Sequence, residues 1–382
     1  MRLSSRRTLT LSLATLLATA SAAASTAPAS ALPTRAPIAT RLGLTLAQFV
    51  HAHPTFPGVA VAVRAPGLAW SGATGLADRS SRTPLTTAAP FRIASVTKTF
   101  TAAAILRLAE NGKLTLDDPI GQHLSSYTVA LLRHGGYDVS AIRVRNLLQH
   151  TSGLHDYADD PAYQTFVLGH PRHRWTRAEQ LRFAVNHGKP LFPPGTDFHY
   201  TDTDYILLGE ILERVTGRGL AAAYRTLLGF NRLGLHHTYL ETLEPTPAHT
   251  RTRAHQYLGA TDTAGFDPSF DLYGGGGLVS TVDDLARFYR ALINGHVYKN
   301  AATLRTMLGD PGSRHPSDLG MGIFAESVGQ ETCWHHDGFW GTTVLHCPHT
   351  DVTIAITVNQ AEDFDTAIQQ LEATVLQIVN RT

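Results

Sequence analysis

A serine and a lysine stand three residues apart in this chain, as Ser95 and Lys98. On a helix this spacing places two side chains on one face, with Cβ atoms about 5–6 Å apart. The residues that follow are mostly apolar or small up to Gly112, so we expect a buried helix that ends at this glycine. A buried amine loses its proton readily, and a neutral amine beside a hydroxyl can act as its base. The pair therefore predicts a nucleophilic serine, although most pairs at this spacing lie on solvated helix faces.

Lysine is scarce in this chain, whereas arginine carries most of the positive charge. The lysines are Lys98, Lys113, Lys189 and Lys299. An arginine side chain stays protonated and cannot act as a base, but a buried lysine can. A lysine at this position favours a catalytic role for Lys98. Whether the role is real depends on other catalytic residues elsewhere in the chain.

The bulk composition is that of a globular protein. The chain has 382 residues, 43% hydrophobic and 16% charged, which suffices for one large domain or two tightly packed ones. The net charge is +1 and the charges are scattered, which argues against nucleic acid or an anionic membrane surface as a partner. The chain contains 20 histidines, but neither the His-Glu-x-x-His nor the Cys-x-x-Cys spacing occurs. We therefore expect no metal site and no cofactor.

The N-terminus has the pattern of a targeting segment. Arg2, Arg6 and Arg7 precede a short apolar run at 9–20, and small residues follow. We expect a signal peptide at 1–31 with cleavage near 24–31, a linker at 32–43 and one domain at 44–382. The apolar run is too short to span a bilayer, so export to the periplasm or the medium is expected, with no integral membrane segment after signal removal. The Arg6-Arg7 pair resembles a twin-arginine signal, which leaves the export route open.

The chain has two cysteines, Cys333 and Cys347, which lie at equal distances from Trp340. If a hairpin turns around Trp340, the two face each other across its strands, close enough for a disulfide. An exported protein permits this bond. The alternative is two unpaired buried thiols.

Hydrophobic patterning gives the order of the elements. We expect a short helix at 44–53, paired strands at 59–64 and 68–77, a short helix at 144–154, and a lid or small helical region at 156–194. An amphipathic helix is expected at 205–215, and another after an N-cap at Ser280 or Thr281. Strands are expected at 320–327, 331–338, 342–346 and 351–359, before a helix at 364–379. This order predicts an α+β fold whose antiparallel sheet is built from both chain ends and flanked by helices.

Three short motifs in this order resemble those of the penicillin-recognising serine hydrolases. They are Ser95-Val-Thr-Lys98, Tyr200-Thr-Asp202 and His336-Asp-Gly338, with supporting stretches at 150–154 and 276–281. The chain is most similar to the branch that holds class C β-lactamases, serine D-Ala-D-Ala carboxypeptidases, and related esterases and D-aminopeptidases. The resemblance runs from about residue 44 to the C-terminus and implies the β-lactamase/transpeptidase-like fold.

The resemblance implies a role for each motif residue. Ser95 would attack a carbonyl and carry the acyl group, and a nearly neutral Lys98 would accept its proton. Tyr200 would pass the proton to the leaving group, which requires a pKa pulled below its usual value of about 10 by a nearby cation. His336, where the family often has lysine, would supply a hydrogen bond or positive charge. Without the motifs, Tyr200 would be read as an ordinary buried aromatic and His336 as a solvent-facing strand residue.

The resemblance also implies backbone roles at the third motif. Gly338 would let the substrate backbone approach closely. The N–H groups of Ser95 and Phe339 would form the oxyanion hole, where each donor contributes about 3–4 kcal/mol.

Two substrate-binding positions depart from the family pattern. Asp202 stands where the family more often has asparagine, and Asp337 replaces a hydroxyl residue that meets the substrate carboxylate. A carboxylate at Asp202 would hold Lys98 more firmly charged, and Asp337 would repel a second carboxylate. Both changes leave room for an ester or for a D-amino-acid amide, whose free amine Asp337 would attract.

The first hypothesis is an exported serine hydrolase with an acyl-Ser95 intermediate, related to D-Ala-D-Ala carboxypeptidases and β-lactamases. Its partners would be a small peptide, a peptidoglycan stem peptide, or an amide or ester substrate, and penicillin would label it. An esterase or D-aminopeptidase on the same fold is the alternative. A third hypothesis, from another class, is a catalytically silent module that binds cell wall. The presence of Ser95, Lys98 and Tyr200 together argues against it.

Overall fold

The structure is a computed structural model that describes residues 36–309 and 319–380. The predicted signal peptide at 1–31 lies outside these residues. None of the described helices is long and apolar enough to cross a membrane.

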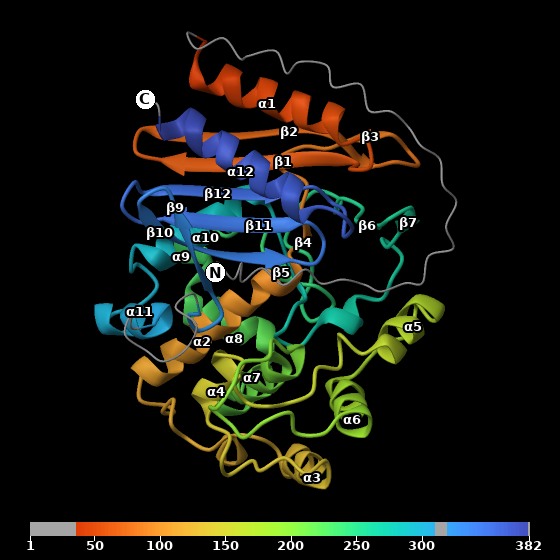
Figure 1. Ribbon diagram of the computed structural model, residues 1–382, viewed down its shortest axis with the longest axis vertical. Helices are drawn as coiled ribbons and strands as arrows, with labels where there is room; N and C mark the ends of the chain where they lie inside the picture. The colour runs from red at the N-terminus through yellow and green to blue at the C-terminus, as the bar shows by residue number, and fades with distance from the viewer. Residues whose placement is uncertain (1–35, 310–318, 381–382) are drawn as a thin grey trace, which may run out of the picture.

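A seven-stranded antiparallel sheet forms the upper part of the molecule in Figure 1, in the order β3-β2-β1-β12-β11-β10-β9. The first strand that the structure describes, β1 (Gly58–Ala65), pairs with the last, β12 (Val352–Thr357), at the middle of the sheet, with Val61 opposite Ile356. The other strands are β2 (Leu68–Asp78), β3 (Thr83–Pro84), β9 (Phe324–Val328), β10 (Glu331–Gly338) and β11 (Thr342–Cys347). The predicted sheet built from both chain ends is therefore confirmed.

The two faces of the sheet belong to different hydrophobic cores. On β1, Val59, Val61 and Val63 pack with residues of α1 (Ile38–Ala52) and α12 (Asp365–Asn380), which cover the outer face. Ala60 and Ala62 point the opposite way, into a larger core. Because successive side chains of a strand alternate between faces, a central strand buried on both sides reads as a continuous apolar run.

The larger core joins the inner face of the sheet to a mainly helical region, the lower part of Figure 1. Its central helix is α2 (Thr97–Glu110), which packs against α7 (Asp202–Thr216) and α8 (Leu220–Leu228). The remaining helices are α3 (Ser126–His134), α4 (Val144–Leu148), α5 (Pro161–Gly169), α6 (Arg177–His187), α9 (Phe230–Leu233), α10 (Val282–Ile293) and α11 (Ala301–Leu308). Two small sheets consist of β4 (Phe91–Arg92), β8 (Leu278–Ser280) and β5 (Tyr239–Leu240), and of β6 (Tyr257–Leu258) and β7 (Thr261–Asp262).

Two element boundaries differ from those expected. The first helix begins at Ile38, inside the predicted linker, because Pro37 precedes it with a backbone already suited to a helix start. The helix expected at 144–154 ends at Leu148, and His150 after it has a left-handed backbone with φ of 55°. The stretch 150–154 is therefore a loop.

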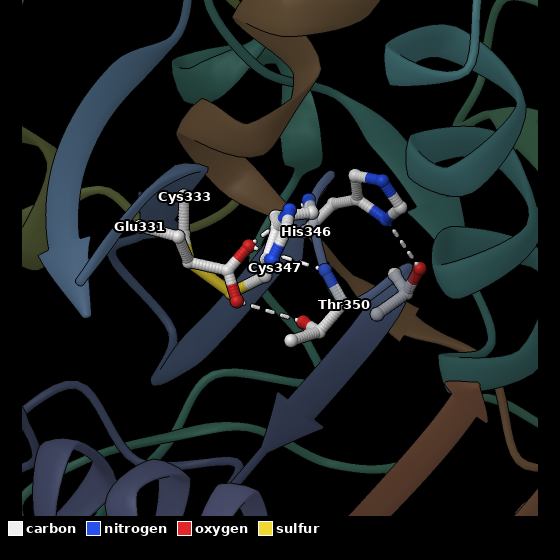
Figure 2. The surroundings of a disulfide bond; sticks show 7 residues. Glu331, Cys333, His346, Cys347 and Thr350 are labelled. Atoms are coloured by element: carbon white, nitrogen blue, oxygen red, sulfur yellow. Dashed lines mark hydrogen bonds between the residues drawn. A yellow bond between two sulfur atoms is a disulfide. The ribbon is translucent and has the colours of Figure 1, made fainter. Parts of the chain in front are cut away.

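The predicted disulfide between Cys333 and Cys347 is present and joins β10 to β11 (Figure 2). The two residues lie directly across the strand pair from each other, and both are buried. Glu331 fixes the neighbouring turn, because its carboxylate accepts hydrogen bonds from the backbone N–H and the hydroxyl of Thr350. The bond thus reinforces the hairpin whose far end carries the third motif.

Candidate active site

A sharp turn presents Ser95 at the start of α2. Residues Ala94–Val96 form a 3₁₀ turn, and the buried Ala94 has a left-handed backbone with φ of 43°. Such a conformation costs an alanine energy and persists only where the surroundings enforce it. Ser95 remains partly exposed, while Lys98 is fully buried at 0% exposure. The predicted pairing of a hydroxyl and an amine on one helix start is therefore confirmed.

Three oxygen atoms surround the amine of Lys98. Its Nζ donates to Ser95 Oγ at 2.9 Å and to the backbone carbonyl of Gly275 at 3.0 Å. It also contacts the carboxylate of Asp202 at the start of α7. The amine is thus a hydrogen-bond donor to the proposed nucleophile in this arrangement.

The expectation that Lys98 is nearly neutral is wrong for this arrangement. Burial acts to lower the pKa of Lys98, but the negative charge of Asp202, together with the Tyr200 hydroxyl, outweighs it and raises the pKa above its usual value. The sequence predicted this effect, because Asp202 stands where the family more often has an uncharged asparagine.

Tyr200 lies beside the pair, with its ring centroid 4.9 Å from Lys98 Nζ. Burial raises the pKa of Tyr200 to about 12, although Lys98 and a hydrogen bond with Ser95 act to lower it. The expected pKa below 10 is therefore wrong, because desolvation of the phenolate exceeds the attraction of the cation. Tyr200 is a neutral phenol next to Ser95 and Lys98.

His336 is buried on β10, and its ring centroid is 6.4 Å from that of Tyr200. Its Nδ1 lies 2.8 Å from the carbonyl oxygen of Asp337, which makes Nδ1 the protonated nitrogen. Burial, followed by the charge of Lys98, lowers the pKa of His336 to about 3. The histidine is therefore neutral, and only the hydrogen-bonding part of its expected role remains open to it.

The end of β10 lies against the turn that carries Ser95. A Cβ on Gly338 would come within 2.3 Å of the carbonyl oxygen of Ile93. The close approach that requires glycine is thus an internal one, with the chain's own backbone rather than with a substrate. It places the end of β10 against residues Ile93 and Ala94, directly before Ser95, and the oxyanion hole at the N–H groups of Ser95 and Phe339 stays a prediction.

An open stretch of strand edge borders the same site. β9 pairs with residues 331–335 of β10, whereas the motif residues 336–338 pair only with β11 among the described strands. Asp337 in this stretch has a side chain 35% exposed, and its Oδ2 lies 3.7 Å from Nδ1 of His335.

Several carboxyl groups share the surroundings of Lys98. Burial raises the pKa of Asp156, Asp159, Asp204 and Asp271, and the charge of Asp202 adds to the effect in each case while Lys98 opposes it. The pKa of Asp271 reaches about 6. A raised pKa favours the protonated, neutral form, so these groups limit the negative charge that surrounds Lys98.

Sequence reasoning missed part of this arrangement. Asp156 accepts a hydrogen bond from the Asp202 backbone N–H at 3.0 Å, which fixes the start of α7. Asp202 and Asp271 approach the adjacent glycines Gly275 and Gly276, where added Cβ atoms would lie 2.6 Å and 1.9 Å from their Oδ1 atoms. The run of four glycines at 274–277 was the available signal, but it does not show which side chains approach.

Two other groups of residues have metal-ligand geometry, and neither includes a residue of the predicted site. Asp78, His255 and Asp262 bring one ligand atom each within 4.8 Å of one another. In the second group, Glu331 lies beside Cys333 and Cys347, whose sulfur atoms are joined in the disulfide.

Residues 46–377 match the model of the family described as Beta-lactamase. Among curated proteins, the chain is 28% identical over 310 residues to Esterase EstB of Burkholderia gladioli, covering 75% of this chain and 76% of the esterase. It is 32% identical over 180 residues to Penicillin-binding protein 4 of Amycolatopsis lactamdurans, covering 47% of this chain and 44% of that protein.

Among solved structures, the fold is similar to that of the D-amino acid amidase from Ochrobactrum anthropi SV3 complexed with L-phenylalanine amide. The TM-score is 0.74 at 26% identity, covering 90% of this chain and 99% of the amidase.

Proposed function

Because the chain belongs to the Beta-lactamase family, whose members include serine hydrolases, we propose that it hydrolyses amides of D-amino acids through an acyl-Ser95 intermediate. The observation that carries this choice is the carboxylate of Asp202 in contact with Lys98, with Asp159 and Asp271 nearby. A cation bound nearby lowers the raised pKa values of Asp159 and Asp271, so a substrate with a protonated amine beside the cleaved bond would ionise these carboxyl groups and be attracted to them.

A cationic substrate would also change the charge of Lys98. Its ammonium group would offset the negative charge of Asp202, so that the proton on Lys98 is held less firmly. The free enzyme keeps the lysine protonated, and substrate binding favours the neutral amine that a base requires. This accounts for a carboxylate at a position where it raises the pKa of Lys98.

The proposed reaction has two halves. Ser95 Oγ bonds to the substrate carbonyl carbon while its proton passes to Lys98, and the C–N bond breaks as Tyr200 delivers a proton to the leaving nitrogen. The N–H groups of Ser95 and Phe339 stabilise the oxyanion. Lys98 then passes its proton to Tyr200, which restores both groups. A water molecule adds its hydroxyl to the acyl carbon as the bond to Ser95 Oγ breaks, so that the acid is released and the remaining proton of the water returns to Ser95. His336, which is neutral, lies beside Tyr200 and helps to position it.

Two other substrates remain second candidates. The similarity to Esterase EstB covers three quarters of both chains and supports ester hydrolysis at the same serine. The similarity to a penicillin-binding protein supports a D-Ala-D-Ala carboxypeptidase acting on peptidoglycan stem peptides. The C-terminal carboxylate of such a peptide would be repelled by Asp202 and Asp337, so we expect slower turnover of it.

A substrate panel tests the proposal with the wild type and Ser95→Ala. We expect D-Ala p-nitroanilide to be cleaved at least about 10-fold faster than its N-acetyl derivative and than the L-isomer, a difference of about 1.4 kcal/mol in transition-state binding. Ser95→Ala should abolish all three activities. D-Ala release from a pentapeptide without anilide cleavage would support the carboxypeptidase instead.

Turnover of p-nitrophenyl acetate alone would support the esterase. A chain whose Ser95 is labelled neither by a fluorophosphonate nor by a penicillin, and which cleaves nothing in the panel, would not be a hydrolase. Pull-down on peptidoglycan would then test the cell-wall-binding hypothesis.

A further inference from the structure

One buried histidine holds both neighbours of Tyr200. The carbonyl oxygen of His150 accepts a hydrogen bond from the His199 N–H at 2.9 Å. On the other side, its ring Nδ1 accepts one from the Thr201 N–H at 3.2 Å. The residues directly before and after Tyr200 are therefore tied, through their N–H groups, to the backbone and the side chain of a single residue.

The imidazole ring also lies against the phenol itself. The ring centroids of His150 and Tyr200 are 4.4 Å apart at an interplanar angle of 31°, within the range of favourable aromatic contacts. The ring centroid of Tyr205 lies 5.0 Å from that of the same imidazole. The Tyr205 hydroxyl donates a hydrogen bond to the Leu148 carbonyl oxygen at 3.0 Å. With 1% of its surface exposed, His150 has little freedom to move away.

This arrangement requires a particular backbone and a particular charge state. The left-handed backbone of His150, with φ of 55°, turns its carbonyl and its ring toward the same segment. Nδ1 can accept from Thr201 only while it is unprotonated, so the imidazole is neutral and carries its proton on Nε2. Burial, then the charge of Lys98, holds the pKa of His150 well below its usual value, which preserves this state.

We propose that His150 is a positioning residue that sets where the Tyr200 hydroxyl lies between Ser95 and the leaving group, through two hydrogen bonds flanking Tyr200 and one ring contact. The inference rests on the proposed role of Tyr200 as the group that protonates the leaving nitrogen. An ordinary core histidine would fill the same volume, but its removal would affect every substrate alike.

Two substrates with different leaving groups separate these roles. An amide nitrogen must be protonated before it can leave, whereas p-nitrophenolate leaves without a proton. Misplacing Tyr200 should therefore slow cleavage of D-Ala p-nitroanilide far more than cleavage of the p-nitrophenyl ester. The ratio of the two kcat values is the readout, with the melting temperature measured alongside.

We expect His150→Leu to lower the amide-to-ester ratio by about 30-fold or more at nearly unchanged KM, as Tyr200→Phe does. His150→Asn should lower it less, by about 5-fold, because asparagine tolerates a left-handed backbone and its oxygen can accept from Thr201. Tyr205→Phe is the matched control. It removes a buried hydrogen bond next to the same imidazole without freeing Tyr200, and the ratio should stay at the wild-type value.

An unchanged ratio in His150→Leu, with Tyr200→Phe lowering it, would overturn the inference and leave the proposed reaction standing. If His150→Leu does not fold, an unchanged ratio in His150→Asn is equally decisive. If Tyr200→Phe itself leaves the ratio unchanged, the role of Tyr200 and the inference both fall. Should the wild type cleave no amide, ethyl and p-nitrophenyl esters of one acid replace the pair, because ethoxide also needs a proton to leave.

Discussion

The carboxylate of Asp202 contacts the ammonium group of Lys98, which in turn donates to Ser95 Oγ at 2.9 Å. Asp202 therefore affects how firmly Lys98, the proposed base, holds its proton. Burial acts to lower the pKa of Lys98, but the carboxylate raises it, and under the proposed function the same carboxylate attracts the amine of the substrate. This double effect links the identity of the substrate to the pH dependence of the reaction.

Replacing Asp202 by asparagine should shift the pH profile. Without the carboxylate, the pKa of Lys98 falls, and because activity rises as Lys98 loses its proton, the acidic limb of kcat/KM moves to lower pH. The preference for a free amine over an N-acetyl substrate should fall by about 10-fold. The profiles are measured with both substrates, and Asp197→Asn, an exposed carboxylate in the preceding loop, is the control. An Asp202→Asn enzyme with an unmoved limb and unchanged preference would contradict the link.

Gly338→Ala should remove most activity. Its Cβ would lie 2.3 Å from the Ile93 carbonyl oxygen, so β10 must move away from the turn that carries Ser95. Loss of one oxyanion donor alone lowers kcat by about 100-fold or more. Gly43→Ala is the matched control, because its Cβ meets nothing within 4 Å and it lies inside α1, where alanine is the better helix former. Equal kcat values for the two variants would show that the contact at Ile93 does not matter.

Removing the disulfide should destabilise the hairpin without destroying the site. The Cys333–Cys347 bond closes a loop with a sequence separation of 14, for which chain entropy predicts a loss of about 3 kcal/mol in the free energy of unfolding. The five paired positions between β10 and β11 remain, so the double alanine variant should fold and cleave substrate at low temperature. Urea unfolding of both proteins checks this, and coincident midpoints would be the opposite result.

Acid should destabilise the protein through protonation of His346. This side chain is buried, and its Nδ1 lies 2.7 Å from Thr353 Oγ1. Burial lowers the pKa of His346 from its usual 6.5 to about 4. The unfolded chain therefore binds this proton first, so the contribution to stability is present above pH 6.5 and is lost as the pH falls to about 4. The change is on the order of 3 kcal/mol.

His346→Gln, which does not titrate, should flatten the stability profile between these two pH values. The exposed His349→Gln serves as the control and should keep the wild-type slope. Unfolding by urea at about pH 7, about pH 5.5 and about pH 4.5, one value above this range and two within it, provides the measurement. Parallel profiles for wild type and His346→Gln would assign the acid sensitivity to other groups.

Much of the fold followed from the sequence because its signals are local. An apolar and β-branched run marked the strand expected at 351–359, and the amphipathic pattern at 205–215 marked α7. The disulfide followed from the equal spacing of two cysteines around a turn. In each case the pattern acts on neighbours along the chain or directly across a hairpin.

The charge states in the site could not be obtained in the same way. The pKa of Lys98 depends on how far burial and the Asp202 carboxylate offset each other, and a sequence gives neither the depth nor the distance. Asp271 lies far along the chain from Asp202, and the two approach only through the adjacent glycines Gly275 and Gly276. The hydrogen bonds that His150 accepts from the residues beside Tyr200 likewise depend on the left-handed backbone of His150, which no sequence motif predicts.

The pairing of β1 with β12 has a consequence for how the molecule is assembled during synthesis. The first strand emerges early, yet its neighbour in the sheet arrives near the end of the chain, and contacts this distant in sequence form slowly. The helices around Ser95 can gather first, but β10 and its motif have no sheet to join until the final strands arrive. We therefore expect the proposed site at Ser95 to be assembled only after β11 and β12 have joined the sheet.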